Sequence, residues 1–432
     1  PVLGVPGGKP PTPMNAGKDS AQTPPRRAAA MRFIMIAVLI DMISIGIIVP
    51  VLPPLVGEFV QSPVDHALWY GVLAFAFSFA NFLGAPLLGA LSDRYGRRRV
   101  LLLGFGGLGF NFFAMAYASD LAWLIVVRMI GGFLQSNAAI ANAYVADISS
   151  PEERAKRFGM LGAMFGIGFI LGPVLGGVLG DIDLQLPFLV AGAFALANLL
   201  YGLFVLPESL PSERRRAVDL KRVDPLSALG RVARLHGIGR LLWVIAATNL
   251  STFVMYTTWV LFTTYRFGWG PRENGWSLFA MGLASTVVQG FLLTPLLRRF
   301  GARQLAIAGL ASSGVGYLCW GLATAPWMMF AVIGCNLLGW TVNASIQSIV
   351  SNAADAQTQG ETMGAVSSLA SFMAVIAPMF AAPLMALVSD LPRFDWRVGA
   401  PMYFCAALQL TAMVLAWRHF TQTPRRVVEA TS

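Results

Sequence analysis

The chain has 432 residues, of which 56% are hydrophobic and only 12% are charged. Soluble domains carry about a quarter charged residues, so the composition excludes an ordinary soluble enzyme or binding domain and indicates an integral membrane protein. The net charge of +10 would suit nucleic acid, but the basic residues lie between apolar segments, where membrane topology accounts for them. We therefore expect contact with membrane lipids and no nucleic-acid partner.

The residue types that bind metals or carry nucleophilic chemistry are few and scattered. No Cys or His pair has the spacing of a metal or redox site, and no glycine-rich phosphate-binding loop is present. We expect no cofactor, no metal site and no enzymatic activity. The residues concerned are Cys319, Cys335, Cys405, His66, His236 and His419.

Residues 1–31 form an arm that is rich in Pro, Gly and Ala, which predicts disorder. The chain opens on Pro1, and Met14 and Met31 follow, so we expect part of the arm to be an upstream extension and leave the true start open. No cleavable signal precedes Arg32, so the first span is expected to serve as the insertion signal.

Twelve apolar stretches have the roughly 20 residues that a membrane-spanning helix needs. They predict an all-α membrane protein with six-helix bundles at 32–206 and 240–418, a basic linker at 207–239 and a tail at 419–432. The expected spans are 33–56, 69–91, 99–118, 121–146, 157–180, 186–206, 240–264, 275–297, 302–323, 326–350, 362–388 and 399–417.

Most of the 31 Lys and Arg residues lie in the arm, the linker, the even-numbered loops and the tail. The odd-numbered loops hold only Arg266, Arg272, Arg393 and Arg397. Because cytoplasmic loops carry the basic excess, both termini are predicted to be cytoplasmic.

Two ionisable residues lie well inside predicted spans, Asp41 in the first and Arg128 in the fourth. Charged groups at mid-bilayer are costly and mark functional sites by default. A fixed pair that clasps the two helices together is the alternative. Burial and a nearby arginine would act on the proton affinity of Asp41 in opposite directions, and the sequence leaves that balance open.

The loop Gly89–Leu101 joins the second and third spans. Gly96 permits a tight turn, and cations such as Arg94 and Arg97 suit an anionic membrane surface, with Asp93 a carboxylate among them. On these residues alone, a basic loop that only sets topology is an equally good interpretation.

An internal repeat supports the division into halves. A shift of 205 residues places Gly84–Gly104 on Gln289–Gly309 without a gap, so that Gly96 meets Gly301. Two six-span halves related by a parallel repeat are typical of one large group of membrane transporters.

The fifth span carries a dense run of small residues. Glycines four apart let helices approach closely, and a proline bends a helix; ordinary membrane packing is the alternative to a functional motif. The run comprises Gly168, Gly172, Pro173, Gly176 and Gly177.

Polar and aromatic residues at helical spacing follow one face of the fourth, seventh and tenth spans, and an amide lies in the eighth. Aromatic rings beside amides suit a planar, partly apolar small molecule better than a sugar or an ion. Hydrogen bonding between helices is the alternative. The predicted cavity residues are Gln135, Asn142, Asn249, Thr252, Tyr256, Trp259, Gln289, Asn336, Trp340, Asn343 and Gln347.

The basic loop resembles the signature loop of the major facilitator superfamily. The matching positions are Gly89, Asp93, Arg94, Gly96, Arg97 and Arg98. The resemblance implies twelve helices in two halves, with helices 1, 4, 7 and 10 lining a central cavity. It also implies a cytoplasmic gating cluster of Asp93, Arg94, Arg97 and Asp147 that latches the halves in the outward-open state.

Two further motifs resemble those of proton-coupled members. Arg128, with Gly132 and Gln135 after it, fits the family's helix-4 pattern, which implies a role in proton coupling together with Asp41. The glycine and proline run of the fifth span resembles the motif that separates exporting antiporters from symporters.

The segments that begin at Tyr144 and Leu206, and the run that follows Asp41, resemble the tetracycline-resistance efflux branch of the drug:proton antiporters. That branch carries titratable residues in helices 3, 8 and 9. Neutral residues occupy those positions here, so tetracycline itself and a coupling route through the second half remain open. They are Asn111, Ser285 and Ser313.

Our leading hypothesis is therefore a proton-driven exporter of an amphipathic, drug-like small molecule that works by alternating access. A carrier of the same fold for an endogenous metabolite, not coupled to protons, is the alternative. A scaffold that uses residues 209–235 to bind a partner is a third hypothesis, which the polar stripes disfavour. The resemblance implies a monomer in the bacterial inner membrane.

Overall fold

The computed structural model describes residues 24–215, 239–353 and 359–422, and these residues form helices and connecting loops. The helices of the first half are α1 (Pro24–Ile48), α2 (Leu52–Gly57), α3 (Pro63–Tyr95), α4 (Arg97–Ala116), α5 (Leu121–Leu134), α6 (Asn137–Ile148), α7 (Pro151–Ile182) and α8 (Leu186–Val205). A short turn, η1 (Ser212–Arg214), follows.

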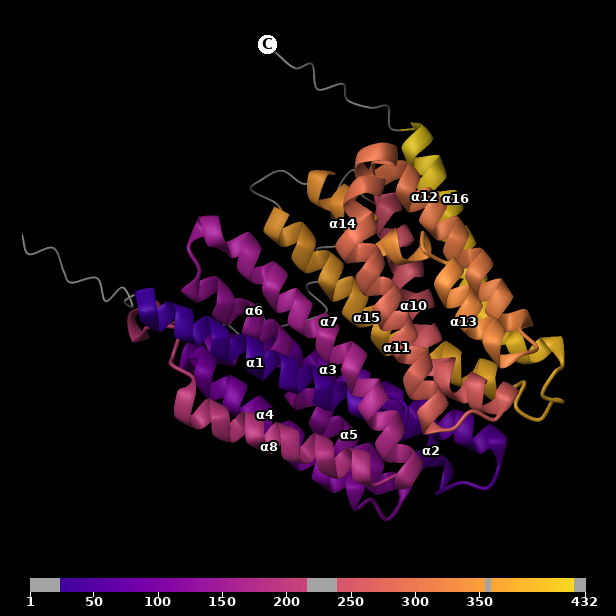
Figure 1. The fold of residues 1–432 in the computed structure, drawn as a ribbon, viewed down its shortest axis with the longest axis horizontal. Coiled ribbons are helices and arrows are strands. Elements are labelled where there is room, and N and C mark those ends of the chain that lie inside the picture. Colours follow the sequence, from indigo (N-terminus) through magenta and orange to yellow (C-terminus); the bar gives the residue numbers. More distant parts are fainter. Residues whose placement is uncertain (1–23, 216–238, 354–358, 423–432) are drawn as a thin grey trace, which may run out of the picture.

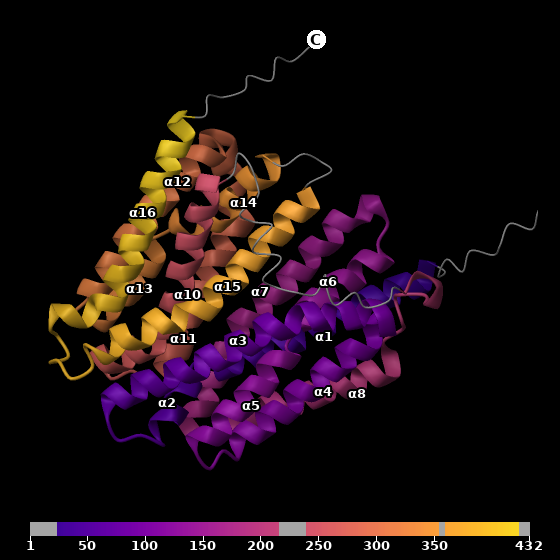
Figure 2. The same cartoon turned by 180° about the vertical axis from the view of Figure 1, so that it is seen from behind.

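The second half contains α10 (Gly239–Phe267), α11 (Pro271–Val287), the π-helical turn η2 (Val288–Leu292), α12 (Leu293–Leu322), α13 (Pro326–Cys335), η3 (Gly339–Thr341), α14 (Val342–Ala353), α15 (Gln359–Ala386), η4 (Trp396–Gly399) and α16 (Ala400–Gln422). Each half forms its own bundle, indigo to magenta and orange to yellow in Figure 1, and the reverse view shows the same division (Figure 2).

The number of spans agrees with the prediction of twelve. In the described residues, ten helical segments are long and apolar enough to cross a membrane, and the bent pair formed by α13 and the helical segment Gly339–Ser351 makes an eleventh. One segment, Pro271–Leu322, is 52 residues long and reverses at Gly301, whose φ of 73° interrupts the helix. It therefore contains two spans.

Local sequence signals account for many helix starts. The Asp120 side chain accepts a hydrogen bond from the backbone N–H of Trp123 at 2.8 Å, which satisfies a donor that the helix leaves free. That bond, and a second one from the Ser119 hydroxyl, lower the pKa of Asp120. Ser150 caps α7 in the same way, with a proline directly after it.

The predicted spans at 33–56, 121–146 and 326–350 are present, but each is interrupted by a break in its helix. The first breaks near Pro50, and the fourth breaks at Gln135, where a side chain from another helix replaces the lost backbone partners. The Asn81 amide on α3 donates to the carbonyls of Gly132 and Gln135 at 3.2 and 2.6 Å. The tenth breaks after Asn336 and bends by 55°.

The two bundles meet along two helix pairs. Between α3 and α15, Gly71 lies against Ala382 and the ring centroids of Phe82 and Phe372 are 6.0 Å apart. Between α7 and α11, Gly177 packs against Gly275 so closely that a side chain on either glycine would collide with the other helix.

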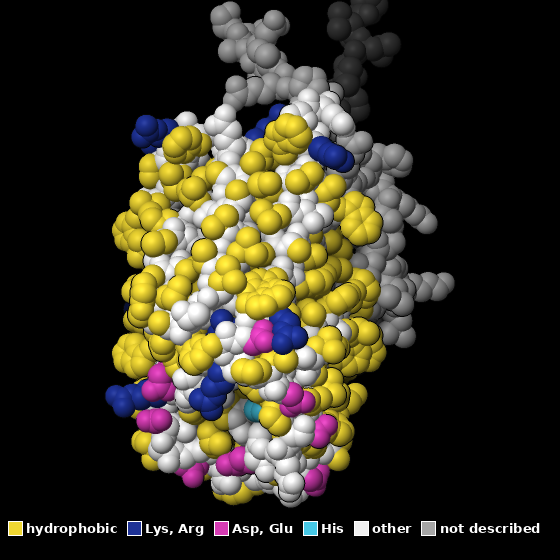
Figure 3. All heavy atoms as spheres, turned by 90° about the vertical axis from the view of Figure 1, so that its right-hand side faces the viewer, with side chains coloured by type: hydrophobic (Ala, Val, Ile, Leu, Met, Phe, Trp, Pro, Cys, Tyr) yellow, Lys and Arg dark blue, Asp and Glu magenta, His cyan; other side chains and the backbone are white. Residues whose placement is uncertain are grey.

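The lipid-facing surface is apolar. On the face that Figure 3 shows, a broad hydrophobic band covers the upper half below a few basic side chains, and acidic and basic side chains are spread over the lower half. Phe110, Trp243, Phe291 and Leu387 are among the large hydrophobic residues that the fold leaves exposed. Such a surface is stable only in hydrocarbon, so the protein is a multi-pass membrane protein.

The predicted segment boundaries need three comments. The predicted disordered arm ended at residue 31, but α1 already begins at Pro24, and 1–23 lie outside the described residues. Of the linker 207–239, the structure describes 207–215 and the first helical residue, Gly239. Of the tail 419–432, α16 includes the first residues up to Gln422, and 423–432 lie outside.

Candidate substrate pathway

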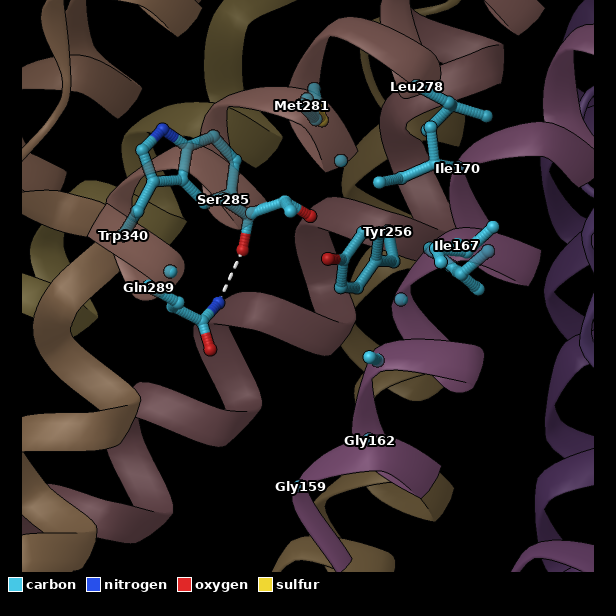
Figure 4. Close-up of a pocket in the computed structure, with 16 residues that line it drawn as sticks. Gly159, Gly162, Ile167, Ile170, Tyr256, Leu278, Met281, Ser285, Gln289 and Trp340 are labelled. Atoms are coloured by element: carbon cyan, nitrogen blue, oxygen red, sulfur yellow. Dashed lines mark hydrogen bonds between the residues drawn. The ribbon is translucent and has the colours of Figure 1, made fainter. Parts of the chain in front are cut away.

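A cavity of about 500 Å³ lies between α7 of the first half and α11 of the second. Figure 4 shows Tyr256 and Trp340 in it, with the Tyr256 hydroxyl pointing toward Ser285 and Gln289. The Gln289 amide donates to Ser285 Oγ at 2.5 Å. Ile167, Ile170, Leu278 and Met281 supply apolar surface.

Two smaller chambers lie in the C-terminal half. One, of about 160 Å³, shares Tyr256, Ser285, Gln289 and Trp340 with the main cavity. The other, of about 280 Å³, lies between α10, α14 and α15 and shares Thr248 and Asn343 with the first chamber. Their lining in the described residues contains amides, hydroxyls and aromatic rings, and no Asp, Glu, Lys, Arg or His.

Most of the predicted cavity residues line these spaces. Those that do are Asn249, Thr252, Tyr256, Gln289, Asn336, Trp340, Asn343 and Gln347. Ser285 and Ser313 also line them, whereas Asn111 is buried on α4, where its amide donates to the Met115 sulfur at 3.6 Å.

Three predicted cavity residues lie elsewhere. Trp259 is fully buried in the core of the C-terminal half, where its indole N–H donates to Ser277 Oγ at 2.9 Å and its ring meets that of Trp320 edge-on. Gln135 ends α5, and Asn142 is exposed and donates to a carbonyl of its own helix. None of the three lines the cavities described above.

Asp41 lies inside the N-terminal half, where only 3% of it is exposed. Its carboxylate accepts one hydrogen bond, at 3.0 Å, from the Asn137 amide at the start of α6. A buried carboxylate with a neutral donor as its hydrogen-bond partner lacks the charge compensation that buried ions normally have.

Arg128 does not pair with Asp41, so the clasp that the sequence left open is not formed. Its guanidinium lies 3.9 Å from the centroid of the Phe77 ring on α3, a cation–π geometry. Arg128 Nε has no hydrogen-bond partner among the described residues.

The predicted charge cluster forms around Arg97. Its guanidinium contacts Asp93 at 2.6 Å and Asp147 at 3.2 Å, and it donates to Ser92 Oγ at 2.6 Å. Arg94 is not part of this arrangement, because its guanidinium lies against the neighbouring Tyr95 ring, 5.2 Å from the centroid.

The start of the linker is attached to the same cluster, which sequence reasoning missed. Ser209 donates to Asp147 at 3.2 Å, and Glu208 accepts the backbone N–H groups of Arg97 and Ser209 at 2.8 and 3.1 Å. The partners named here all belong to the N-terminal half and the linker, so these contacts, among the described residues, do not bridge the two halves.

The glycine run of α7 faces two partners. Gly168, Gly172 and Gly176 lie against α1, and an added β-carbon at Gly176 would overlap the backbone of Ile47. Gly177, on another face, lies against Gly275 of the C-terminal half. Near the start of α7, by contrast, a β-carbon at Gly159 or Gly162 would meet no atom within 4 Å. The α7–α11 pair is therefore closed at one end and open at the other.

Several residues of the site gave no distinct signal in the sequence. Asn137, Asn81 and Phe77 are single polar or aromatic residues in apolar spans, and only their neighbours in space give them importance. Glu208 lies in the segment whose resemblance was noted, but the pattern did not indicate that it caps α4.

Two six-helix bundles around an uncharged cavity define a membrane transporter of small molecules rather than an enzyme. The chain matches the family model described as Major Facilitator Superfamily over residues 34–378 and 244–431. It is 35% identical over 395 residues to the tetracycline resistance protein, class C, of Escherichia coli, which covers 91% of this chain and 99% of that protein. The chain belongs to the major facilitator superfamily, in its tetracycline-resistance efflux branch.

Solved structures agree with this assignment. The human organic anion transporter TETRAN is 25% identical and superposes with a TM-score of 0.68, covering 91% of this chain and 100% of that one. A bacterial homolog of the human lysosomal transporter Spinster, inward-facing and occupied, gives a TM-score of 0.71 over 92% of this chain and 98% of its own at 14% identity, a likeness of fold alone.

Proposed function

We propose that the protein exports an amphipathic, drug-like small molecule, such as tetracycline or a related compound, in exchange for protons. It acts as a monomer in the bacterial inner membrane, with both termini in the cytoplasm. In this orientation the open end of the α7–α11 pair faces the cytoplasm, so the structure corresponds to a state that takes up its substrate from the inside.

The environment of Asp41 is the observation that carries the proposal. A carboxylate held in the membrane interior by one neutral amide changes from charged to neutral when it takes up a proton, and the cost of the charged form is large in such surroundings. Its helix packs on α7 through Gly46 and Gly172, and α7 in turn packs on α11. Protonation can therefore bias the packing by which the halves meet.

The cavity supports the substrate class. Its apolar wall, aromatic rings and neutral hydrogen-bonding groups suit a planar molecule with polar edges. The identity to the class C tetracycline resistance protein and the glycine run of α7 support the direction of transport.

The test is transport of tetracycline in proteoliposomes with an imposed pH gradient. For Asp41→Asn we expect gradient-driven accumulation to fall at least about tenfold, whereas exchange of labelled for unlabelled tetracycline without a gradient persists, because the cavity is intact. Asp181→Asn, which removes an exposed carboxylate from α7, is the matched control. Full gradient-driven transport by Asp41→Asn would refute the coupling role.

A metabolite carrier without proton coupling is the second candidate. It is favoured by the neutral residues Asn111, Ser285 and Ser313 and by the likeness to a human organic anion transporter. The cavity linings contain no cation that would hold an anion, which is why we rank it second. Flux by the wild-type protein that is unaffected by a proton uncoupler would reverse the ranking.

A further inference from the structure

Two polar side chains deep in the C-terminal half border the 160 Å³ chamber without a hydrogen-bond partner. Gln409 on α16 and Thr248 on α10 are each 2% exposed, and both line the chamber. Neither Gln409 Oε1 nor Thr248 Oγ1 has a partner among the described residues. Unsatisfied buried polar groups are costly, so a native protein that retains them adjacent to a cavity requires an explanation.

The chamber is too small for a whole drug-sized molecule, but it adjoins a cavity that is large enough. Ligand pockets for such molecules have about 300–1,000 Å³, a range that the main cavity of 500 Å³ meets. Tyr256, Ser285, Gln289 and Trp340 line both spaces. A molecule in the main cavity can therefore extend one edge into the chamber.

The chemistry of the chamber selects a neutral, hydrogen-bonding edge. A carboxamide offers one acceptor and two donors, and a hydroxyl offers both functions. Ser313 and Asn336 add further groups of this kind, and aromatic rings such as Trp320 form part of the wall. A hydroxyl or carboxamide substituent satisfies these groups, whereas a purely apolar edge leaves them unpaired.

We propose that this chamber is a hydrogen-bonding subsite for the hydroxyl- or carboxamide-bearing edge of the exported compound, with Gln409 and Thr248 as specificity-determining residues. The inference rests on the proposed export function and deepens it. It assigns a substrate contact to α16, a helix outside the four that the superfamily resemblance led us to expect around the cavity.

The N-terminal half offers a matched comparison. Asn198 on α8, the last helix of that half, is also a fully buried amide whose oxygen has no partner among the described residues, but its NH₂ group donates to the carbonyl of Ala37 on α1 at 2.9 Å. It links two helices and lines none of the cavities described above. Asn198 is thus an amide that holds two helices together, whereas Gln409 is an amide that is available to bind a ligand.

The experiment compares Gln409→Leu with wild type in proteoliposomes, using tetracycline, which carries hydroxyl and carboxamide groups, and tetraphenylphosphonium, which has no hydrogen-bond donor. We expect KM for tetracycline to rise roughly three- to tenfold, the worth of one hydrogen bond, and KM for tetraphenylphosphonium to stay unchanged. The melting temperature of the ligand-free variant should equal or exceed that of wild type, because a polar group without a partner has been removed. Thr248→Val should act in the same direction.

The control is Asn198→Leu, for which we expect a lower melting temperature and an unchanged KM for tetracycline. A Gln409→Leu protein that melts as low as Asn198→Leu would show that Gln409 is structural and overturn the proposal. If a stable Gln409→Leu protein has the same KM for tetracycline as wild type, the chamber holds only water, and the proposal is overturned as well. If wild type moves neither compound, the proposed function fails, and the melting comparison of Gln409→Leu decides the role of the chamber.

Discussion

In the N-terminal half, the polar groups that we propose to be functional are ionisable and engage neighbours in the same half: Asp41 meets Asn137, and Arg97 meets Asp93 and Asp147. In the C-terminal half they are amides, hydroxyls and aromatic rings that border open chambers. Its one fully buried arginine in the described residues, Arg266, lies at the edge of the bundle, where backbone carbonyls hold it.

This difference indicates a division of labour. Under the proposed function, proton exchange takes place at Asp41 in the N-terminal half, and the polar ligand contacts come from the C-terminal half. A change in protonation in the N-terminal half must then affect the C-terminal half through the helix pairs that join the two halves. One of these pairs, α7–α11, which includes the contact of Gly177 with Gly275, borders the main cavity. Its helix α7 also packs on α1, the helix that carries Asp41.

The largest expected effect comes from disturbing the packing of the N-terminal half. In Gly176→Leu the new side chain would overlap the backbone of Ile47, and α7 can accommodate it only by separating from α1. We expect a loss of about 3 kcal/mol or more in the free energy of unfolding and little folded protein on size-exclusion chromatography. Gly162→Leu on the same helix, where nothing lies within 4 Å, should yield normal amounts. Equal yields from both variants would contradict the tight packing that we assign to this half.

A smaller effect is expected from the charge cluster. Arg97→Gln removes the cation that both Asp93 and Asp147 contact, and the cluster is partly buried, so solvent compensates incompletely. If the cluster gates the transporter, the maximal transport rate should fall roughly tenfold with little change in KM. Arg94→Gln, which alters a guanidinium outside the cluster, should transport normally.

The double variant Arg97→Gln with Asp147→Asn separates gating from stability. Removing one uncompensated carboxylate should restore part of the rate. A lowered melting temperature with an unchanged transport rate in Arg97→Gln would instead show that the cluster serves folding alone. The charges of the N-terminal half around Arg97 would then have no part in transport.

The sequence predicted the features that depend on short segments of chain. Apolar length predicted the twelve spans, whereas the cluster of Asp93, Arg97 and Asp147 was expected only from the family resemblance, because Asp147 lies 50 residues from Arg97. The repeat aligned Gly301 with Gly96, and the structure shows a positive φ at both glycines.

The features that depend on neighbours in space could not be predicted. Helical spacing places Tyr256 and Trp259 on nearby faces of one helix, but only packing decides that the first borders the cavity and the second meets Trp320 in the core. The break after α5 depends on Asn81 from another helix. Asp41 and Arg128 share a half but contact different neighbours, Asn137 and Phe77, because helical periodicity does not encode which residues of different helices meet.

Trp259 and Trp340 give the smallest and most specific test of the comparison. In Trp259→Phe the hydrogen bond to Ser277 is lost while the ring remains, so we expect the free energy of unfolding to fall by about 1 kcal/mol and KM for tetracycline to stay unchanged. In Trp340→Phe, which trims a cavity wall and removes only a long hydrogen bond of 3.4 Å to the Ile333 carbonyl, we expect the reverse, a KM about threefold higher and a similar melting temperature. Thermal melting and transport measured on both variants decide the matter, since a raised KM in Trp259→Phe would return that residue to the cavity. The core of the C-terminal half would then be part of the binding site, and the distinction between its packed core and its chambers would have to be abandoned.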